Sequence, residues 1–73
     1  MFRLMGRHKK GKIVRRRIGD SFTEVETENG NRWVCNYVKN SGWCIFRNGS
    51  FVKKCNKRMQ SDRIMMRMAV KNG

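Results

Sequence analysis

Residues 22–38 read FTEVETENGNRWVCNYV, and at their centre Asn29-Gly30 separates two runs rich in β-branched and aromatic residues. Asn-Gly between two such runs is typical of a two-residue hairpin with positive φ at both central positions. We therefore predict antiparallel strands over residues 22–28 and 32–38. The remaining strands can be placed outward from this hairpin.

The first of these strands alternates imperfectly. Thr23, Val25 and Thr27 share one face, whereas Phe22 falls on the other face with the glutamates. If Phe22 and Val25 are both buried, the phase has to slip by one residue, which is what a β-bulge does. Because we assign both side chains to the core, we predict a bulge in this strand.

Similar signals recur on both sides of the hairpin. Strand-like runs cover residues 13–18, 43–47 and 50–54, and turn-forming residues separate them at 19–21, 39–42 and 48–49. Short strands with turns every eight to twelve residues are typical of a meander, which occurs in small closed barrels and in open sheets. The predicted fold class is all-β, a small five-stranded OB-like or SH3-like barrel or meander.

The last segment allows a second fold class. Ile64, Met66, Met68 and Val70 alternate with the residues between them, which fits a strand. Methionine and alanine also favour a helix, and Ser61 or Asp62 could cap it. We favour the strand; the alternative is an α+β domain with an antiparallel meander and a C-terminal helix.

Charge is the main indication of function. The 73 residues include 18 Lys or Arg against 5 Asp or Glu, which gives a net charge of +13, and four of the five acids lie between Asp20 and Glu28. So much like charge destabilises a compact chain by self-repulsion, and a bound polyanion relieves that repulsion. Nucleic acid is the commonest such partner, because its phosphates are closely spaced and release counterions when they are neutralised.

The length allows one small domain. We assign residues 1–10 to a basic N-terminal arm and residues 11–73 to the β-rich domain. No apolar run is long enough for a membrane span or a secretory signal, so we expect no membrane partner. The three cysteines, Cys35, Cys44 and Cys55, are odd in number and widely spaced, which indicates reduced thiols in a cytoplasmic protein.

Neither a metal site nor a catalytic site is predicted. No Cys-x-x-Cys pair is present, and the only histidine is His8, so the sequence indicates no metal and no cofactor. A nucleophile–base pair would have to use His8, which no neighbouring group orients. Glu24, Glu26 and Glu28 alternate along a strand and form a solvated face more readily than a catalytic pair. We therefore expect a protein that is not an enzyme and has no small-molecule substrate.

Part of the chain resembles a known family. The matching positions are Gly11, Ile13-Val14, Phe22, Val25, Glu28-Asn29-Gly30 and the ending at residues 61–67. They are similar to the S1-type OB-fold of bacterial translation initiation factor one. The resemblance implies a five-stranded barrel, a final strand over residues 61–67 and a role at the ribosome. The chain departs from the family by one extra residue between Phe22 and Asn29, and it has residues 38–42 where the family has a basic segment.

Basic and aromatic residues together make the predicted nucleic-acid site. The basic candidates are Arg7, Lys9, Lys10, Lys12, Arg15, Arg16, Arg17, Arg32, Lys53, Lys54, Lys57 and Arg58. In a meander these cations can converge on one surface, with phosphates between them. Trp33 and Tyr37 share one strand face and are the best candidates for stacking on unpaired bases, and Trp43 is the next. The predicted core is Ile13, Phe22, Val25, Val34, Ile45, Phe46 and Phe51.

The acidic segment has three interpretations. It can keep one side of the molecule away from phosphate, or contact a basic protein. It can also hold Arg15, Arg16 and Arg17 by cross-strand pairing, which is the interpretation we favour.

Two functional hypotheses follow. The first is a small basic protein that binds nucleic acid, RNA or a single strand in preference to a duplex, with a ribosomal association as a variant. The alternative is a small protein, such as a phage encodes, that binds the acidic channel of a host nucleic-acid enzyme and inhibits or modifies that enzyme. Composition does not separate them, because an acidic cleft and a phosphate backbone attract the same charge.

Overall fold

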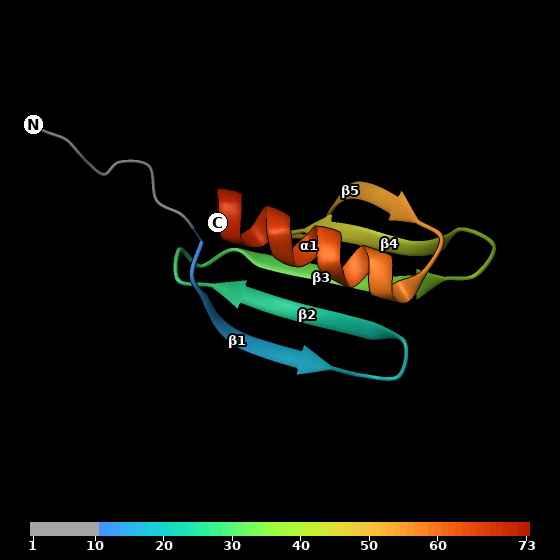
Figure 1. Ribbon diagram of the computed structural model, residues 1–73, viewed down its shortest axis with the longest axis horizontal. Helices are drawn as coiled ribbons and strands as arrows, with labels where there is room; N and C mark the ends of the chain where they lie inside the picture. The colour runs from blue at the N-terminus through green and yellow to red at the C-terminus, as the bar shows by residue number, and fades with distance from the viewer. Residues whose placement is uncertain (1–10) are drawn as a thin grey trace, which may run out of the picture.

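A computed structural model of the chain describes residues 11–73 (Figure 1). Its elements are β1 (Ile13–Ile18), β2 (Phe22–Thr27), β3 (Arg32–Val38), β4 (Gly42–Arg47), β5 (Ser50–Cys55) and α1 (Arg58–Asn72). The strands form one antiparallel sheet in the order β1-β2-β3-β4-β5. The predicted five-stranded meander is confirmed, with the C-terminal helix of the alternative fold class. The S1-type resemblance itself stays a prediction.

The segment for which we favoured a strand is a helix. Ser61, Met65 and Ala69 follow one another at intervals of four residues, and all three are fully buried. This spacing places them on one helical face, so burial of that face outweighs the alternation seen in the sequence. The predicted cap is also wrong. The helix begins after Lys57, which makes no side-chain capping bond, and Ser61 lies in the core instead.

The two Asn-Gly turns differ. Asn48 and Gly49 have φ of 51° and 89° and join paired Arg47 and Ser50, as a two-residue hairpin requires. At Asn29-Gly30 the predicted two-residue hairpin is wrong. Only Gly30 has positive φ (88°), and its N–H donates to the Thr27 carbonyl at 2.9 Å. The loop is longer there: β2 ends at Thr27 and β3 begins at Arg32, so four residues separate the strands, and the Thr27 N–H donates to the Asn31 carbonyl.

Bulges lie in the outer strand pairs and not in β2. The register shifts at Val14 in β1 and again in the β4–β5 pair opposite Ile45 and Phe46. β2 alternates without a slip, so Thr23, Val25 and Thr27 are buried while Phe22 stays on the opposite side with Glu24. The bulge predicted in β2 is therefore wrong.

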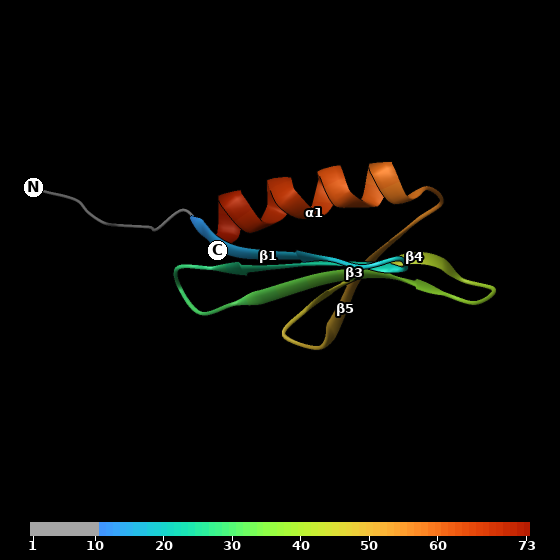
Figure 2. The same ribbon diagram turned by 90° about the horizontal axis from the view of Figure 1, so that it is seen from below.

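The molecule has two layers, because α1 covers one side of the sheet and leaves the other side uncovered (Figure 2). We call these sides the helix face and the open face. The core lies between α1 and the helix face and consists of Val25, Trp33, Cys35, Ile45, Cys55, Met65 and Ala69, with Ile13 packed against it. The predicted core positions Val34, Phe22 and Phe46 are only half-buried, and Phe51 is 60% exposed. Their positions in the strands place them on the open face, away from the helix.

Candidate nucleic-acid interface

Arginines of the open face are paired with the acidic strand β2. Arg17 and Arg32 both contact the Glu24 carboxylate, at 3.0 Å and 3.1 Å, and Arg15 lies 3.7 Å from Glu26. The contacts of Arg15 and Arg17 confirm the cross-strand pairing that the sequence predicted for the acidic segment. The same prediction is wrong for Arg16, which lies opposite Val25 on the other face and makes no ion pair within the described chain, and it did not include Arg32. Exposed ion pairs add little stability. Their main effect here is that two carboxylates offset part of the positive charge of the open face, to which Lys54 on β5 adds a fourth cation.

Six exposed cations on the helix side have no such partners within residues 11–73. Four exposed residues belong to α1 and its N-terminal end, and two more come from the sheet edges: Lys57, Arg63, Arg67, Lys71, Arg16 and Lys53. Arg16 and Lys53 lie opposite the core residues Val25 and Ile45 in the strand register, so their side chains leave the sheet on the helix face. None of the ion pairs within residues 11–73 includes any of these six. We call this set the cationic helix surface.

The spacing of basic residues along α1 explains part of the cationic helix surface. Arg63, Arg67 and Lys71 are separated by four residues each, so they lie in one row on the outside of the helix, opposite the buried row. The candidate list from the sequence did not include these three. Their spacing indicates a cationic surface only if the segment is a helix. In a strand, all three would lie on the same face as Met65 and Ala69, so no separate basic face would be expected.

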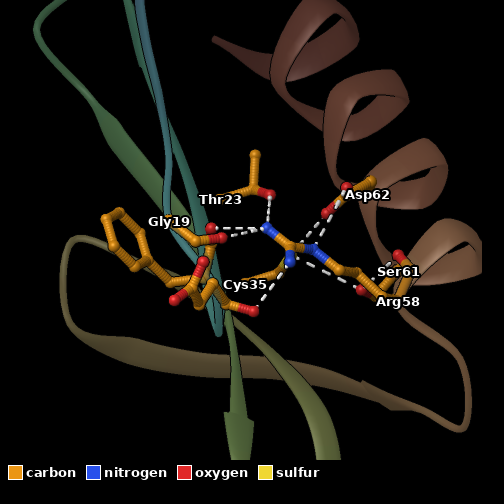
Figure 3. A network of polar contacts seen from close by, with 8 residues as sticks. Gly19, Thr23, Cys35, Arg58, Ser61 and Asp62 are labelled. Atoms are coloured by element: carbon orange, nitrogen blue, oxygen red, sulfur yellow. Dashed lines mark hydrogen bonds and ion pairs between the residues drawn. The ribbon is translucent and has the colours of Figure 1, made fainter.

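The guanidinium of Arg58, a predicted binding residue, already forms hydrogen bonds within the protein (Figure 3). Its guanidinium donates to the carbonyls of Gly19, Asp20 and Phe22 at 2.7–2.9 Å and to Thr23 Oγ1 at 3.2 Å. The same group lies 5.1 Å from the centre of the Trp43 ring. Arg58 therefore fastens the start of α1 to the β1–β2 turn, and few of its donors remain for phosphate.

Cys35, Ser61 and Asp62 form the inner part of this network (Figure 3). The Cys35 thiol lies 2.8 Å from Asp62 Oδ1, to which it donates, and the Ser61 hydroxyl is 3.4 Å from the sulfur. Burial, and then the bond to Asp62, raises the pKa of Cys35 to about 11. The thiol is therefore protonated at neutral pH, which suits a structural donor and not a nucleophile or a metal ligand.

The aromatic candidates separate into buried and accessible rings. Trp33 is 2% exposed and lies under the Arg47 guanidinium, so the stacking role predicted for it is wrong. Its position opposite the helix makes it a core residue. Tyr37 is 50% exposed and meets Trp43 edge to face with 5.6 Å between ring centres. Trp43 is half-buried between Tyr37 and Arg58, so Tyr37 offers the accessible ring of this pair.

The remaining candidates do not converge on one surface. Lys53 and Lys54 project from opposite faces of β5, and Lys12 is exposed just before β1. Arg7, Lys9 and Lys10, with the rest of the predicted arm, lie outside the described residues.

Neither a metal-binding cluster nor a helix able to span a membrane is found within residues 11–73. No group of three His, Cys, Asp or Glu side chains in this part of the chain is arranged to hold a metal ion. The described helix is too short and too polar to cross a bilayer. Comparison with known proteins finds no matching family, no similar curated protein and no similar solved structure.

Proposed function

We propose that this protein binds nucleic acid, and that the cationic helix surface makes the phosphate contacts. One observation carries the proposal: the six cations of that surface are unpaired within the described chain, whereas the open-face arginines are already paired with glutamates. Free cations release the counterions of a polyanion when they bind it, and paired cations release fewer. The positive charge available to phosphate is therefore concentrated on one side.

The preferred substrate in this proposal is RNA or another single strand. Tyr37 lies on the helix face, where a strand that follows α1 toward Lys57 can place an unpaired base on its ring. Stacking of a base on an aromatic ring contributes about 1–3 kcal/mol and does not depend strongly on sequence. Three buried, free cysteines suit a reducing, cytoplasmic compartment.

The test is fluorescence anisotropy with labelled single-stranded RNA, single-stranded DNA and duplex over a salt series. If all six cations contact phosphates, log affinity for a single strand should fall against log salt with a slope of about −4, which is about 300-fold between about 50 and 200 mM. Replacing Arg63, Arg67 and Lys71 with Gln should reduce this slope by about 2. The matched control replaces Arg15, Arg17 and Arg32 with Gln, which removes the same charge from the open face.

The two triple variants have equal net charge, so their comparison separates the site from the total charge. We expect the control to keep most of the slope. An equal or larger loss in the control would place the interface on the open face. Absence of wild-type binding at low salt would reject nucleic acid as the partner, and an acidic channel of a host enzyme would become the better proposal.

Stacking has its own test. Tyr37→Ala should weaken binding of single strands by about fivefold or more, because the ring supplies at least about 1 kcal/mol. Tyr37→Phe keeps the ring and should restore the affinity. The fluorescence of Trp43, next to Tyr37, should change on binding, whereas that of buried Trp33 should change little. Equal losses on duplex and single strand from Tyr37→Ala would contradict the stacking role.

A further inference from the structure

The open face carries an apolar patch that the proposed function does not use. Phe46 and Phe51 meet edge to face with 6.0 Å between ring centres, and Phe51 keeps 60% of its surface exposed. Val34 lies opposite Phe46 in the register and is half-buried beside it. Single exposed apolar residues are normal, but apolar side chains that lie together on an exposed face mark a candidate contact surface.

A pocket adjoins the patch. It has a volume of about 490 Å³, and it is bounded by Val34 and Phe46, by the Glu26 and Arg32 side chains and by the Asn48-Gly49 turn. The β4–β5 hairpin, which ends in this turn, leans away from α1 and past the rest of the sheet (Figure 2). The open face thus presents a projecting ring, Phe51, beside a hollow, and Phe46 borders both.

Charge limits what can approach this face. The whole chain has a net charge of +13, so two copies repel each other over most of their surface. On the open face, Glu24 and Glu26 offset half of the charge of Arg15, Arg17, Arg32 and Lys54. A second copy therefore meets the least repulsion here. A nucleic-acid strand would have to pass close to both carboxylates.

We propose that two copies of this chain associate through their open faces, with Phe51 of each copy inserted into the pocket of the other. A two-fold interface requires that a projection and its complementary hollow lie on the same patch, as they do here. The arrangement leaves both cationic helix surfaces on the outside of the pair. It does not depend on the proposed function, since it uses the opposite side of the molecule.

The size of the face predicts a weak dimer. Five strands spaced about 4.8 Å apart, each of six residues at about 3.3 Å, cover about 24 Å by 20 Å, or about 480 Å² per copy. Stable interfaces bury about 800 Å² per partner, so this one belongs with transient contacts. We expect a dissociation constant on the order of 10–100 µM.

Sedimentation equilibrium over about 5–500 µM protein tests the proposal directly. The average mass should rise from one chain of 8.7 kDa toward two chains, and added salt should favour the dimer because it screens the repulsion between copies. Binding of nucleic acid has the opposite salt dependence, so the two proposals fail independently. Phe51→Ser should weaken association about tenfold or more. The matched control, Ile18→Ser, removes a side chain that is 68% exposed on the helix face and should leave the dimer intact.

Three results would overturn the dimer. The first is a wild type that stays at the mass of one chain at the highest concentration. The second is Phe51→Ser that associates as strongly as the wild type. The third is a wild type that stays at the mass of one chain while Phe51→Ser weakens binding of single-stranded RNA, which would assign the apolar patch to nucleic acid.

Discussion

Replacing Arg58 with Ala should lower the free energy of unfolding more than replacing any other Lys or Arg within residues 11–73. The guanidinium makes four hydrogen bonds to the β1–β2 turn and the start of β2, at Gly19, Asp20, Phe22 and Thr23. These contacts join segments that lie 35 to 39 residues apart in the sequence. No other cation in the described chain connects α1 to the sheet through as many bonds.

The magnitude follows from these contacts. Hydrogen bonds to a charged donor contribute about 1.5–3 kcal/mol each, but the Arg58 side chain is 30% exposed and water can reach the freed carbonyls. The contact with Trp43 adds about 0.5–1 kcal/mol. We expect a total loss of roughly 3 kcal/mol, well below the sum of the bonds. At about 4–8 °C per kcal/mol for a domain of this size, the melting temperature should fall by about 12–24 °C.

Urea unfolding followed by tryptophan fluorescence measures this loss. Arg63→Ala is the control, because it removes the same charge from an exposed position of the same helix and should change stability by less than about 0.5 kcal/mol. Arg58→Lys keeps the charge near Trp43 and Asp62 but loses the planar fork, so its stability should fall between the wild type and Arg58→Ala. If Arg58→Ala and Arg63→Ala had equal stability, the network in Figure 3 would not stabilise the fold.

Three further predictions concern the core. The free energy of unfolding should fall as pH rises from about 9 to 11, because the unfolded thiol of Cys35 ionises near 9.0 while the folded thiol keeps its proton to about 11. Urea unfolding at several pH values should show a shallower fall for Cys35→Ala than for the wild type. An identical fall would reject the raised pKa of Cys35. Trp33→Ala should lower the free energy of unfolding by about 3–5 kcal/mol, measured by urea unfolding. Trp33→Phe should lower it much less, because it keeps an aromatic ring in the core and removes a buried indole N–H that has no partner. Equal losses would contradict this account. Gly11→Ala should destabilise the domain, since an added Cβ would overlap the Ala69 carbonyl oxygen; a melting temperature equal to that of the wild type would refute the close packing.

The sheet could be predicted because its signals are local. The strand over residues 32–38 agrees with the structure at both ends, and Asn48-Gly49 forms the turn that its composition favours. The helix was only the alternative to a favoured strand because Met66 and Met68 suit a strand or a helix equally in sequence. What decides between them is the row of Ser61, Met65 and Ala69 that fits against the sheet, which is a tertiary effect.

Which side chains of the sheet are buried depends on α1, because the helix covers only one of the two faces. From the sequence we assigned Phe46 and Phe51 to the core and Trp33 to the accessible surface. An open sheet with a helix on one side has a single core, and the strand register then buries Trp33 and exposes Phe51. The pattern of alternation separates the two faces of a strand, but it does not state which of the two faces will be covered.

The position of the few acids determines which cations remain available. Glu24 and Glu26 alternate with Val25, so the period of the strand that buries Val25 also sends both carboxylates to the side away from α1. There they meet Arg15, Arg17 and Arg32, which the neighbouring strands bring to the same side. On the helix side the acid that makes an ion pair is Asp62, which is held by Arg58 and Cys35. A chain with a large surplus of positive charge thus has one face where carboxylates offset part of the charge and one where six cations have no ion-pair partner within residues 11–73. This division follows from strand alternation and not from the overall composition.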